Sequence, residues 1–367
     1  MGLSKITAPG VTTDDSFHTK KGRPDIRFLI SDLISGCSSE ERVVIGGCGP
    51  IEMIDALRQV IRKRKISGPS VTLHTENGRR YHAYREGEYA LVCSVPWVLD
   101  VGLDSLTHDR MDLLHHIYNL ILDGEIHIAP IKDPQRVLDI GTGTGIWAVD
   151  FADQYQSSEV IGNDLSPIQP KWVPPNCQFE IDDFESEWSY AHPFDYIHGR
   201  ELAGSIHDFP RLCKQAFYHL RPGGFFEIQS FTVDIFSDDG SIEKAPYTKQ
   251  VVSLVQEASA KFGKPMDNLD TWPAAMKEAG FTDVVCKIVK APSSPWAKDP
   301  KQKEIGRFFQ AHQVHSVPAY TNVLLSRVLG WNKTEIDILN MHVLRESKNL
   351  EVHQYGKLYL IYGRKAL

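Results

Sequence analysis

The sequence predicts an α/β protein whose main domain is a doubly wound, mostly parallel sheet with helices on both faces and a helical cap. Short apolar segments alternate with helical segments between residues 137 and 229, and this alternation favours a parallel sheet. A glycine-rich turn follows the first apolar segment, as it does where a strand leads into a helix at a ligand site. The five expected strands are Val137–Ile140, Glu159–Asp164, Cys177–Ile181, Phe194–His198 and Gly224–Gln229.

Composition restricts the class of protein. The chain has 367 residues, of which 42% are hydrophobic, which is enough for a large core and two or three domains. A net charge of −7 gives no reason to expect binding to nucleic acid or to a bilayer. The six cysteines form no C-x-x-C pair, which indicates reduced thiols inside the cell and no metal site. The sequence shows neither a signal peptide nor a membrane-spanning segment, so we expect a cytoplasmic protein.

The order of apolar and polar segments predicts three parts: residues 1–76, 77–130 and 131–367. The first part is a polar tail followed by a small β-α-β unit, with strands at Arg42–Gly47 and Ser70–His74 around a helix at Ile51–Lys65. The second part is the cap, and its helix is predicted by apolar residues at helical spacing. These residues are Leu113, Leu114, Ile117, Leu120 and Ile121.

The third part continues beyond the fifth strand with mostly helical segments. A late strand is expected at Phe281–Val289 and a closing strand at His353–Tyr362. Thr334 is a candidate N-cap because its hydroxyl can accept a hydrogen bond from a helix N–H group. The expected helices are Tyr247–Phe262, Thr271–Ala279, Ile305–Val317, Leu324–Leu329 and Thr334–Ser347, and Leu220–Gly224 is expected to form a tight turn.

The turn with Gly141, Gly143 and Gly145 is the first candidate ligand site. Glycines let the backbone approach a ligand closely, and the helix that follows offers unpaired N–H groups. The dinucleotide pattern places its third glycine one residue later than this sequence does. Asp139 precedes the turn and suits a ligand with a cationic group. S-adenosylmethionine fits this description better than NAD, and a turn without a ligand is the remaining alternative.

Acidic residues follow the next two strands and complete the candidate cofactor site. Asp164 ends the second strand, where it could accept hydrogen bonds from a ribose diol or instead cap the next helix. Asp182 and Asp183 follow the third strand and could accept from an adenine amino group while Phe184 covers the ring. The alternative for these three residues is a solvated acidic turn.

Taken together, these motifs resemble the class I S-adenosylmethionine-dependent methyltransferases, and in finer detail the LaeA-like methyltransferases of filamentous fungi. The resemblance covers roughly residues 76–367, and the chain departs from it at residues 92–107, which are longer and more apolar than the family's linker. It rests on Glu76–Tyr84, Asp112–His116, Gln135–Ala148, Ile161–Pro170, Phe179–Asp183 and Val352–Tyr355.

This resemblance implies S-adenosylmethionine as cofactor, with Tyr81 and His82 folding over it as part of the cap. If the methyl acceptor is a hydroxyl or an amine, a general base assists its methylation. The candidates are His198, His207 and Glu227, which lie near the expected ends of strands four and five, although a lone histidine is commonly a packed residue. The expected activity is O- or N-methylation of a small molecule in fungal secondary metabolism.

Two alternatives remain open. LaeA-like proteins include a nuclear regulator that works through velvet-type partner proteins, so the chain could be a nuclear binding module. The chain could also be an inactive fusion product, because residues 20–76 resemble the end of the NAD(P)-binding domain of ferric-reductase-type oxidoreductases. That second resemblance rests on Gly22–Arg27, Arg42–Met53 and Ser67–His74. The front half of such a domain is missing, so we expect a remnant without redox activity or a misjoined gene.

Overall fold

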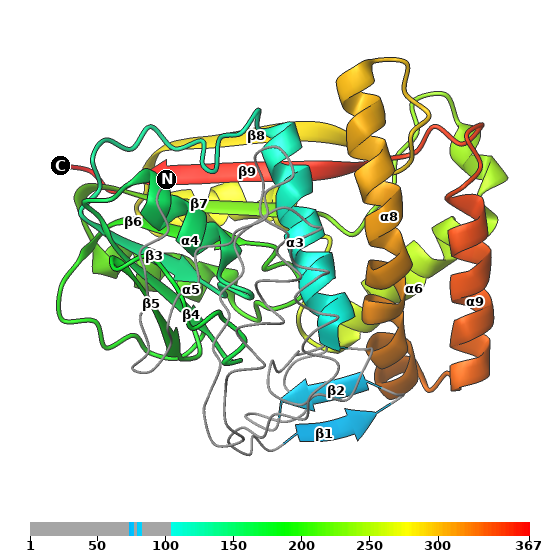
Figure 1. The fold of residues 1–367 in the computed structure, drawn as a ribbon, viewed down its shortest axis with the longest axis horizontal. Helices are drawn as coiled ribbons and strands as arrows, with labels where there is room; N and C mark the ends of the chain where they lie inside the picture. Colours follow the sequence, from blue (N-terminus) through cyan, green and yellow to red (C-terminus); the bar gives the residue numbers. More distant parts are fainter. Residues whose placement is uncertain (1–72, 77–78, 83–103) are drawn as a thin grey trace, which may run out of the picture. The chain divides into compact units, whose positions relative to one another are not determined.

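The computed structural model describes residues 73–76, 79–82 and 104–367. These residues belong to one unit, which runs from Pro69 to Leu367. Its centre is a seven-stranded sheet with the strand order β5-β4-β3-β6-β7-β9-β8 (Figure 1). The strands are β3 (Arg136–Ile140), β4 (Glu159–Asp164), β5 (Cys177–Ile181), β6 (Phe194–Arg200), β7 (Leu220–Phe231), β8 (Thr282–Pro292) and β9 (Tyr355–Arg364).

The sheet confirms the predicted fold class. Strands β3 to β7 pair in parallel, and β9 pairs antiparallel with both β7 and β8. The chain builds outward from β3 to β5 on one side and from β6 to β7 on the other, so the strand order reverses between β3 and β6. Ligands of such sheets bind at the carboxyl ends of the strands where this reversal occurs.

Apolar side chains from alternate positions of the strands cover the two faces of the sheet. In β3, Leu138 and Ile140 pack into a core with α5 and α7, whereas Val137 packs with α4 on the other face. The helices are α3 (Asp104–Ile121), α4 (Ile146–Gln154), α5 (Phe209–His219), α6 (Pro246–Lys261), α7 (Trp272–Glu278), α8 (Pro300–Val323) and α9 (Lys333–Glu346).

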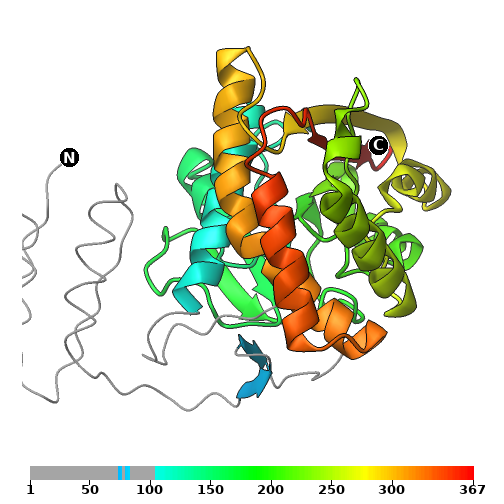
Figure 2. The same ribbon diagram turned by 90° about the vertical axis from the view of Figure 1, so that its right-hand side faces the viewer.

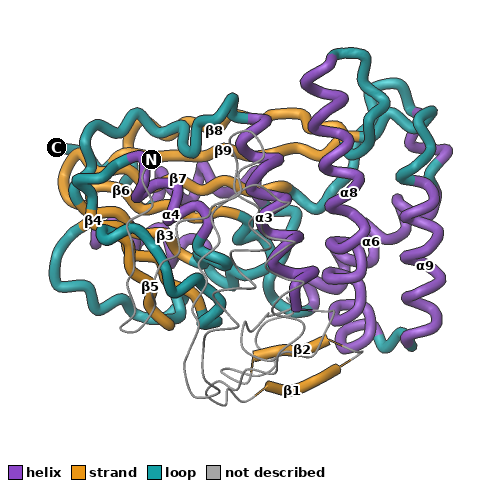
Figure 3. The backbone as a smooth tube through the Cα atoms, in the orientation of Figure 1, coloured by secondary structure: helices purple, strands orange, loops and turns teal. Residues whose placement is uncertain are grey.

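Helices α6, α8 and α9 form a separate layer beyond one end of the sheet (Figures 2 and 3). Their own apolar core includes Val255, Val323 and Leu339. Helix α3 packs on α8, and a second apolar group that contains Ile117, Ile305 and Leu358 joins both helices to β9. Helix α3 and the C-terminal helices therefore lie together at the carboxyl ends of the parallel strands.

Two helix ends differ from the sequence expectation. Thr334 is not the N-cap of α9: Asn332 accepts from the Glu335 N–H, and the Glu335 carboxylate accepts from the Asn332 N–H. This capping box satisfies two N–H groups at once, which a threonine inside the helix cannot do. The segment expected at Ile305–Val317 belongs to the longer helix α8, which Asp299 caps and which continues into one π-helical turn at Leu324–Val328.

Two further expectations concern strand ends. The segment Leu220–Gly224 was expected as a turn, but the structure places it at the start of β7, where the pairing with β6 shifts register. The strand expected at Ser70–His74 is β1 (Leu73–Glu76), and its described partner is β2 (Arg79–His82) in an antiparallel hairpin. The rest of the expected β-α-β unit lies outside the described residues, as do residues 92–103.

We predict that Gly306→Ala destabilises the fold. A Cβ at this position would lie 2.2 Å from the backbone oxygen of Ser294, so α8 would have to move away from the segment after β8. Overpacking of this kind costs about 1–3 kcal/mol of unfolding free energy, measurable by urea denaturation. Arg307→Ala, at an exposed position on the same helix, is the control and should change stability by less than about 0.5 kcal/mol. Equal stability of the two variants would contradict the close contact.

Candidate active site

The glycine-rich turn joins β3 to α4 at the point where the strand order reverses. Gly141, Gly143 and Gly145 have φ angles of 62°, 58° and 78°, in the left-handed region that favours glycine. A Cβ on Gly145 would lie 2.3 Å from the ring of Phe179. Helix α4 begins directly after Gly145, and no side chain caps its first N–H groups. These groups are therefore free to meet a ligand.

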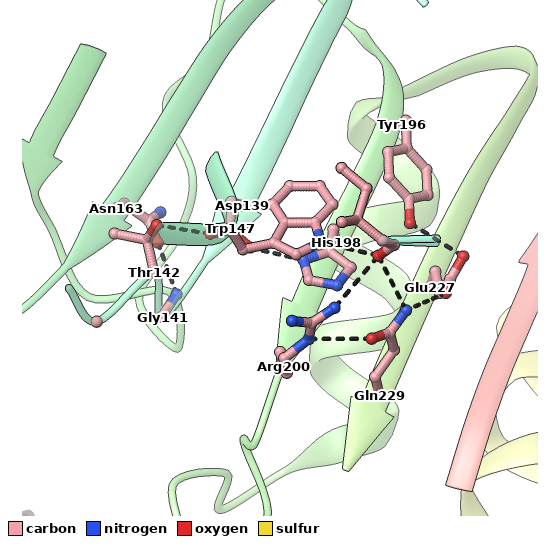
Figure 4. Close-up of polar contacts among 12 residues, drawn as sticks. Asp139, Gly141, Thr142, Trp147, Asn163, Tyr196, His198, Arg200, Glu227 and Gln229 are labelled. Carbon is pink, nitrogen blue, oxygen red and sulfur yellow. Dashed lines mark hydrogen bonds and ion pairs between the residues drawn. The ribbon is translucent and has the colours of Figure 1, made fainter. Parts of the chain in front are cut away.

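Asp139, near the end of β3, holds the glycine-rich turn through a hydrogen bond with Thr142. Its carboxylate is 2% exposed. One oxygen, Oδ1, lies 2.7 Å from Nδ1 of His198, and the other accepts a 2.5 Å hydrogen bond from the Thr142 hydroxyl (Figure 4). Asp139 and His198 are neighbours in register on β3 and β6. The carboxylate thus points to β6 and to its own turn, and its negative charge lies beneath the ligand site.

His198 is a buried member of this arrangement. Its ring stacks on the indole of Trp147 with 3.6 Å between the ring centroids and 9° between the planes (Figure 4). Burial lowers the pKa of His198, although its hydrogen bond to the Asp139 carboxylate opposes this shift. The imidazole is fully buried, and no residue in the part of the chain that the structure describes forms a hydrogen bond with Nε2. This geometry gives His198 a role in holding Asp139, whereas the base expected from the sequence needs access to an acceptor.

Glu227 is also structural in its surroundings. It is 0% exposed, and its carboxylate accepts hydrogen bonds from the Ala129 N–H at 2.8 Å and from the Tyr196 hydroxyl at 3.0 Å. The Ile128 N–H also donates to it. The Gln229 amide is the fourth donor (Figure 4). With four donors around it, Glu227 ties the chain before β3 to β7 and has no open side from which to take a proton.

Asp164 stands at the end of β4 and touches the turn. Its Oδ2 accepts from the Gly143 N–H at 2.9 Å, and its Oδ1 accepts from the Ser166 N–H at 3.0 Å. Burial raises the pKa of Asp164, and these two N–H groups act in the opposite direction. Residues 165–176 form no helix, so the N-cap alternative for Asp164 is wrong. The structure brings this carboxylate against the glycine-rich turn, as a shared ligand site requires.

The residues of the acidic turn after β5 have different surroundings. Asp183 is 1% exposed and accepts hydrogen bonds from the Glu185 N–H and the Ser186 hydroxyl, so it folds its own turn. Asp182 is half-buried, and its backbone N–H donates a 3.2 Å hydrogen bond to the backbone carbonyl oxygen of Asp164. Phe184 packs beside Gly141, 3.4 Å from where a Cβ would lie. Asp182 and Phe184 therefore lie next to the turn.

Three other candidates lie elsewhere or cannot be placed. His207 is exposed on the loop after β6, and its Nδ1 bonds the Gly263 oxygen at 2.8 Å while its N–H bonds Glu185. These contacts separate it from the Asp139 and Asp164 arrangement. Tyr81 and His82 lie on β2. Their part in the site stays a prediction.

The structure adds residues that sequence patterns did not single out. Trp147 follows the turn on α4, and its indole N–H donates to the Ile126 oxygen. Arg200, at the end of β6, donates to Gln229 and lies 4.2 Å over the ring of Tyr118. Glu201 follows with a φ of 57°, which is uncommon for a residue other than glycine. Positive φ at a strand end is a signal of function that only coordinates reveal.

Comparisons with known proteins find related methyltransferases and regulators. The family model described as "Methyltransferase domain" matches residues 113–286. Methyltransferase pytC of Aspergillus terreus is 38% identical over 293 residues, which are 79% of this chain and 87% of pytC. The secondary metabolism regulator laeA of Aspergillus flavus is 34% identical over 80% of this chain and 77% of laeA. The protein-methionine methyltransferase laeA of Emericella nidulans is 33% identical over the same shares.

We predict that Glu227→Gln destabilises the whole domain. The substitution replaces an acceptor oxygen by an NH₂ group that faces existing donors. Leaving buried donors unpaired costs about 1–3 kcal/mol, and more where a charged acceptor is lost. Chemical denaturation should therefore show a lower unfolding free energy. Glu187→Gln, at an exposed position, is the matched control. A Glu227→Gln protein of normal stability would return Glu227 to the list of candidate bases.

Proposed function

This chain belongs to the family of methyltransferases that includes pytC and laeA, and we propose that it methylates a hydroxyl or amine of a small molecule in fungal secondary metabolism. The family assignment bears out the sequence expectation of an S-adenosylmethionine-dependent methyltransferase with a class I fold. The finer parts of the proposal are the residues that hold the cofactor and the chemical class of the acceptor. The single observation that carries the cofactor site is the hydrogen bond from Gly143 N–H to Asp164, because it joins the turn to an acid suited to a ribose diol.

The residues around the turn fit S-adenosylmethionine. Its cationic methionine end would lie over the buried charge of Asp139 and beside the uncapped N–H groups of α4. Asp164 would accept from the ribose diol, Asp182 from the adenine amino group, and Phe184 would cover the adenine ring. We assign Asp183 to folding of the turn. We retain Gly141, Gly143 and Gly145 as the close-approach positions, and Tyr81 and His82 as cap residues on the strength of the resemblance alone.

S-adenosylmethionine supplies a methyl group activated by a sulfonium. The protein contributes position and electrostatics. Asp139, held by His198 and Thr142, keeps one negative charge in a fixed place under the turn. Fixed charges of this kind orient a ligand without reorganisation during the reaction. The acceptor must approach from the side of α3 and α8, since these helices stand over the carboxyl ends of the strands.

We also propose the division of the chain into a cap at residues 77–130 and a methyltransferase domain at residues 131–367. Helix α3 supports this division, because Met111 packs over Gly143 and Thr144 donates a 3.2 Å hydrogen bond to Asp112. None of the helices in the described part of the chain is long and apolar enough to cross a membrane. We place the enzyme in the cytoplasm.

A second candidate function is regulatory. Several relatives at 32–34% identity are secondary metabolism regulators, among them LAE1 of Cochliobolus heterostrophus. This favours a nuclear protein that acts with velvet-type partners. The higher identity to pytC, at 38%, favours the enzyme of a single product. The two functions differ in how many metabolites depend on the chain.

We predict that the full chain binds S-adenosylmethionine and that Asp164→Ala weakens binding by about tenfold or more, because at least one charge-assisted hydrogen bond is lost. Isothermal titration calorimetry measures both affinities. Asp153→Ala, at an exposed position near the end of α4, is the matched control and should bind like the wild type. Circular dichroism checks that each variant is folded. Absence of binding by the wild-type protein would overturn the cofactor assignment.

We predict that disruption of the gene removes one methylated metabolite and causes its unmethylated precursor to accumulate. A gene that carries Asp164→Ala should not restore the product, whereas the Asp153→Ala gene should. Liquid chromatography with mass spectrometry of culture extracts measures this. Loss of many unrelated metabolites would instead favour the regulatory function.

A further inference from the structure

Helix α3 contacts both the glycine-rich turn at Gly141–Gly145 and a separate group of buried polar side chains. Met111 lies with its Sδ 3.4 Å from the position of a Cβ on Gly143. Arg110, its neighbour, is 6% exposed, and its charge acts on His312 and Tyr320 of α8 and on Glu201 after β6. We call these four residues the polar cluster: Arg110, Glu201, His312 and Tyr320. Its member Arg110 directly precedes Met111, which packs over the glycine-rich turn.

Two members of this cluster have hydrogen-bonding atoms without partners. Nε of Arg110 and both ring nitrogens of His312 are buried and have no hydrogen-bond partner among the described residues. His312 is 5% exposed. Burial, together with the charges of Arg110 and His315, lowers the pKa of His312 to about 3, so the ring is neutral and offers one donor and one acceptor. Buried polar atoms without partners cost free energy, and a ligand that pairs with them recovers it.

Glu201 offers the complementary group. Its Oε1 accepts hydrogen bonds from the Tyr118 hydroxyl and from the Phe231 N–H. Both of these donors, from the described part of the chain, bond to Oε1, and Oε2 takes part in neither hydrogen bond. The backbone φ of Glu201, 57°, lies in the left-handed region, which residues other than glycine seldom adopt. Glu201 thus has one oxygen fixed and one oxygen open.

The surroundings of Glu201 suit proton transfer. Burial raises its pKa, while the hydrogen bonds from Tyr118 and Phe231 and the charges of Arg110 and Arg200 act in the opposite direction. A carboxylate whose pKa rises toward the working pH is a better general base than one in water. The groups that face it are Tyr118 and Arg110 from α3, Arg200 from β6 and Tyr320 from α8.

Aromatic side chains pack beside the polar cluster. The ring of Phe231 packs edge-on against Tyr118 and against Phe309, with centroid distances of 5.7 and 5.1 Å. Phe309 in turn lies 5.9 Å from the His312 ring. Arg110 and Glu201 carry opposite charges, and the nearby charge of Arg200 is offset by the carboxylates of Asp139 and Glu227, so the cluster has little net charge to attract an ion. This combination suits a flat, uncharged molecule with a hydroxyl group and a second oxygen.

We propose that the cluster of Arg110, Glu201 and His312 is the methyl-acceptor subsite, and that it binds an uncharged hydroxyaromatic compound with a neighbouring carbonyl oxygen. The inference rests on the proposed methyltransferase function. Arg110 and His312 donate to the carbonyl oxygen, and Oε2 of Glu201 accepts from the hydroxyl. During transfer the hydroxyl proton goes to Oε2 of Glu201, and the acceptor oxygen forms the new bond to the methyl carbon. The electron pair of the old carbon–sulfur bond stays on sulfur.

The test uses the full chain loaded with S-adenosylhomocysteine and three probes: ortho-hydroxyacetophenone, acetophenone and phenol. Ligand-observed NMR should show the tightest binding for ortho-hydroxyacetophenone. Arg110→Met and His312→Phe should each weaken its binding about tenfold, the expected loss for one buried hydrogen bond to a charged or well-placed group. Arg307→Met, exposed on α8, is the matched control and should bind like the wild type.

A second arm separates binding from proton transfer. Glu201→Gln keeps an Oε1 that accepts from Tyr118 and Phe231, so it should still bind ortho-hydroxyacetophenone. It should lose transfer of a deuteriated methyl group from labelled S-adenosylmethionine to this probe, which mass spectrometry detects. Calorimetry on every variant should show unchanged affinity for S-adenosylmethionine.

Each result bears on the inference. A wild-type protein that fails to bind S-adenosylmethionine contradicts the proposed function and the subsite with it. If that binding is intact, three results contradict the subsite alone. They are unchanged probe affinity in Arg110→Met and His312→Phe, wild-type transfer by Glu201→Gln, and a wild-type protein that neither binds nor methylates ortho-hydroxyacetophenone.

Discussion

The contact between Asp139 and His198 is the constraint on which the site depends. It joins two neighbouring strands at the point where the strand order reverses, and it is completely shielded from water. Because the Trp147 ring stacks on His198, the first turn of α4 is fixed to the same pair. Removing the imidazole of His198 would leave a buried carboxylate oxygen without this hydrogen bond, at a cost of about 1–3 kcal/mol. The shape of the glycine-rich turn and the stability of the sheet are therefore linked through one carboxylate.

Buried carboxylates of this protein differ in what surrounds them, and that difference sets their chemistry. Glu227 is enclosed by backbone and side-chain donors from three segments. Asp164 has donors on both oxygens but lies at a strand end beside the turn. Glu201 has donors on one oxygen. Donors therefore enclose the carboxylate in the middle of the sheet more completely than the two carboxylates at its carboxyl edge, where we propose contact with ligands.

Local patterns in the sequence were sufficient for the strands, the turn and the acids that follow each strand. Val137–Ile140 and Glu159–Asp164 could be predicted because a buried parallel strand is a short apolar run, and the three glycines mark positions of positive φ. The roles of His198 and Glu227 could not be predicted, because a polar residue near a strand end looks the same whether it faces a ligand or a neighbouring strand. That choice depends on register and on segments such as Ile128–Ala129, which are far away in the sequence.

Arg110 and His312 could not be predicted for the same reason, because local sequence patterns do not reveal contacts between distant segments. They lie about two hundred residues apart, on α3 and α8, and neither belongs to a motif. Their unpaired nitrogens weaken the fold, since apolar side chains of similar size would pack there at lower cost. Such positions are retained where function needs them, which is the usual trade between stability and activity. Arg110 is followed in α3 by Met111, which packs over Gly143, so this helix links the proposed subsite to the glycine-rich turn.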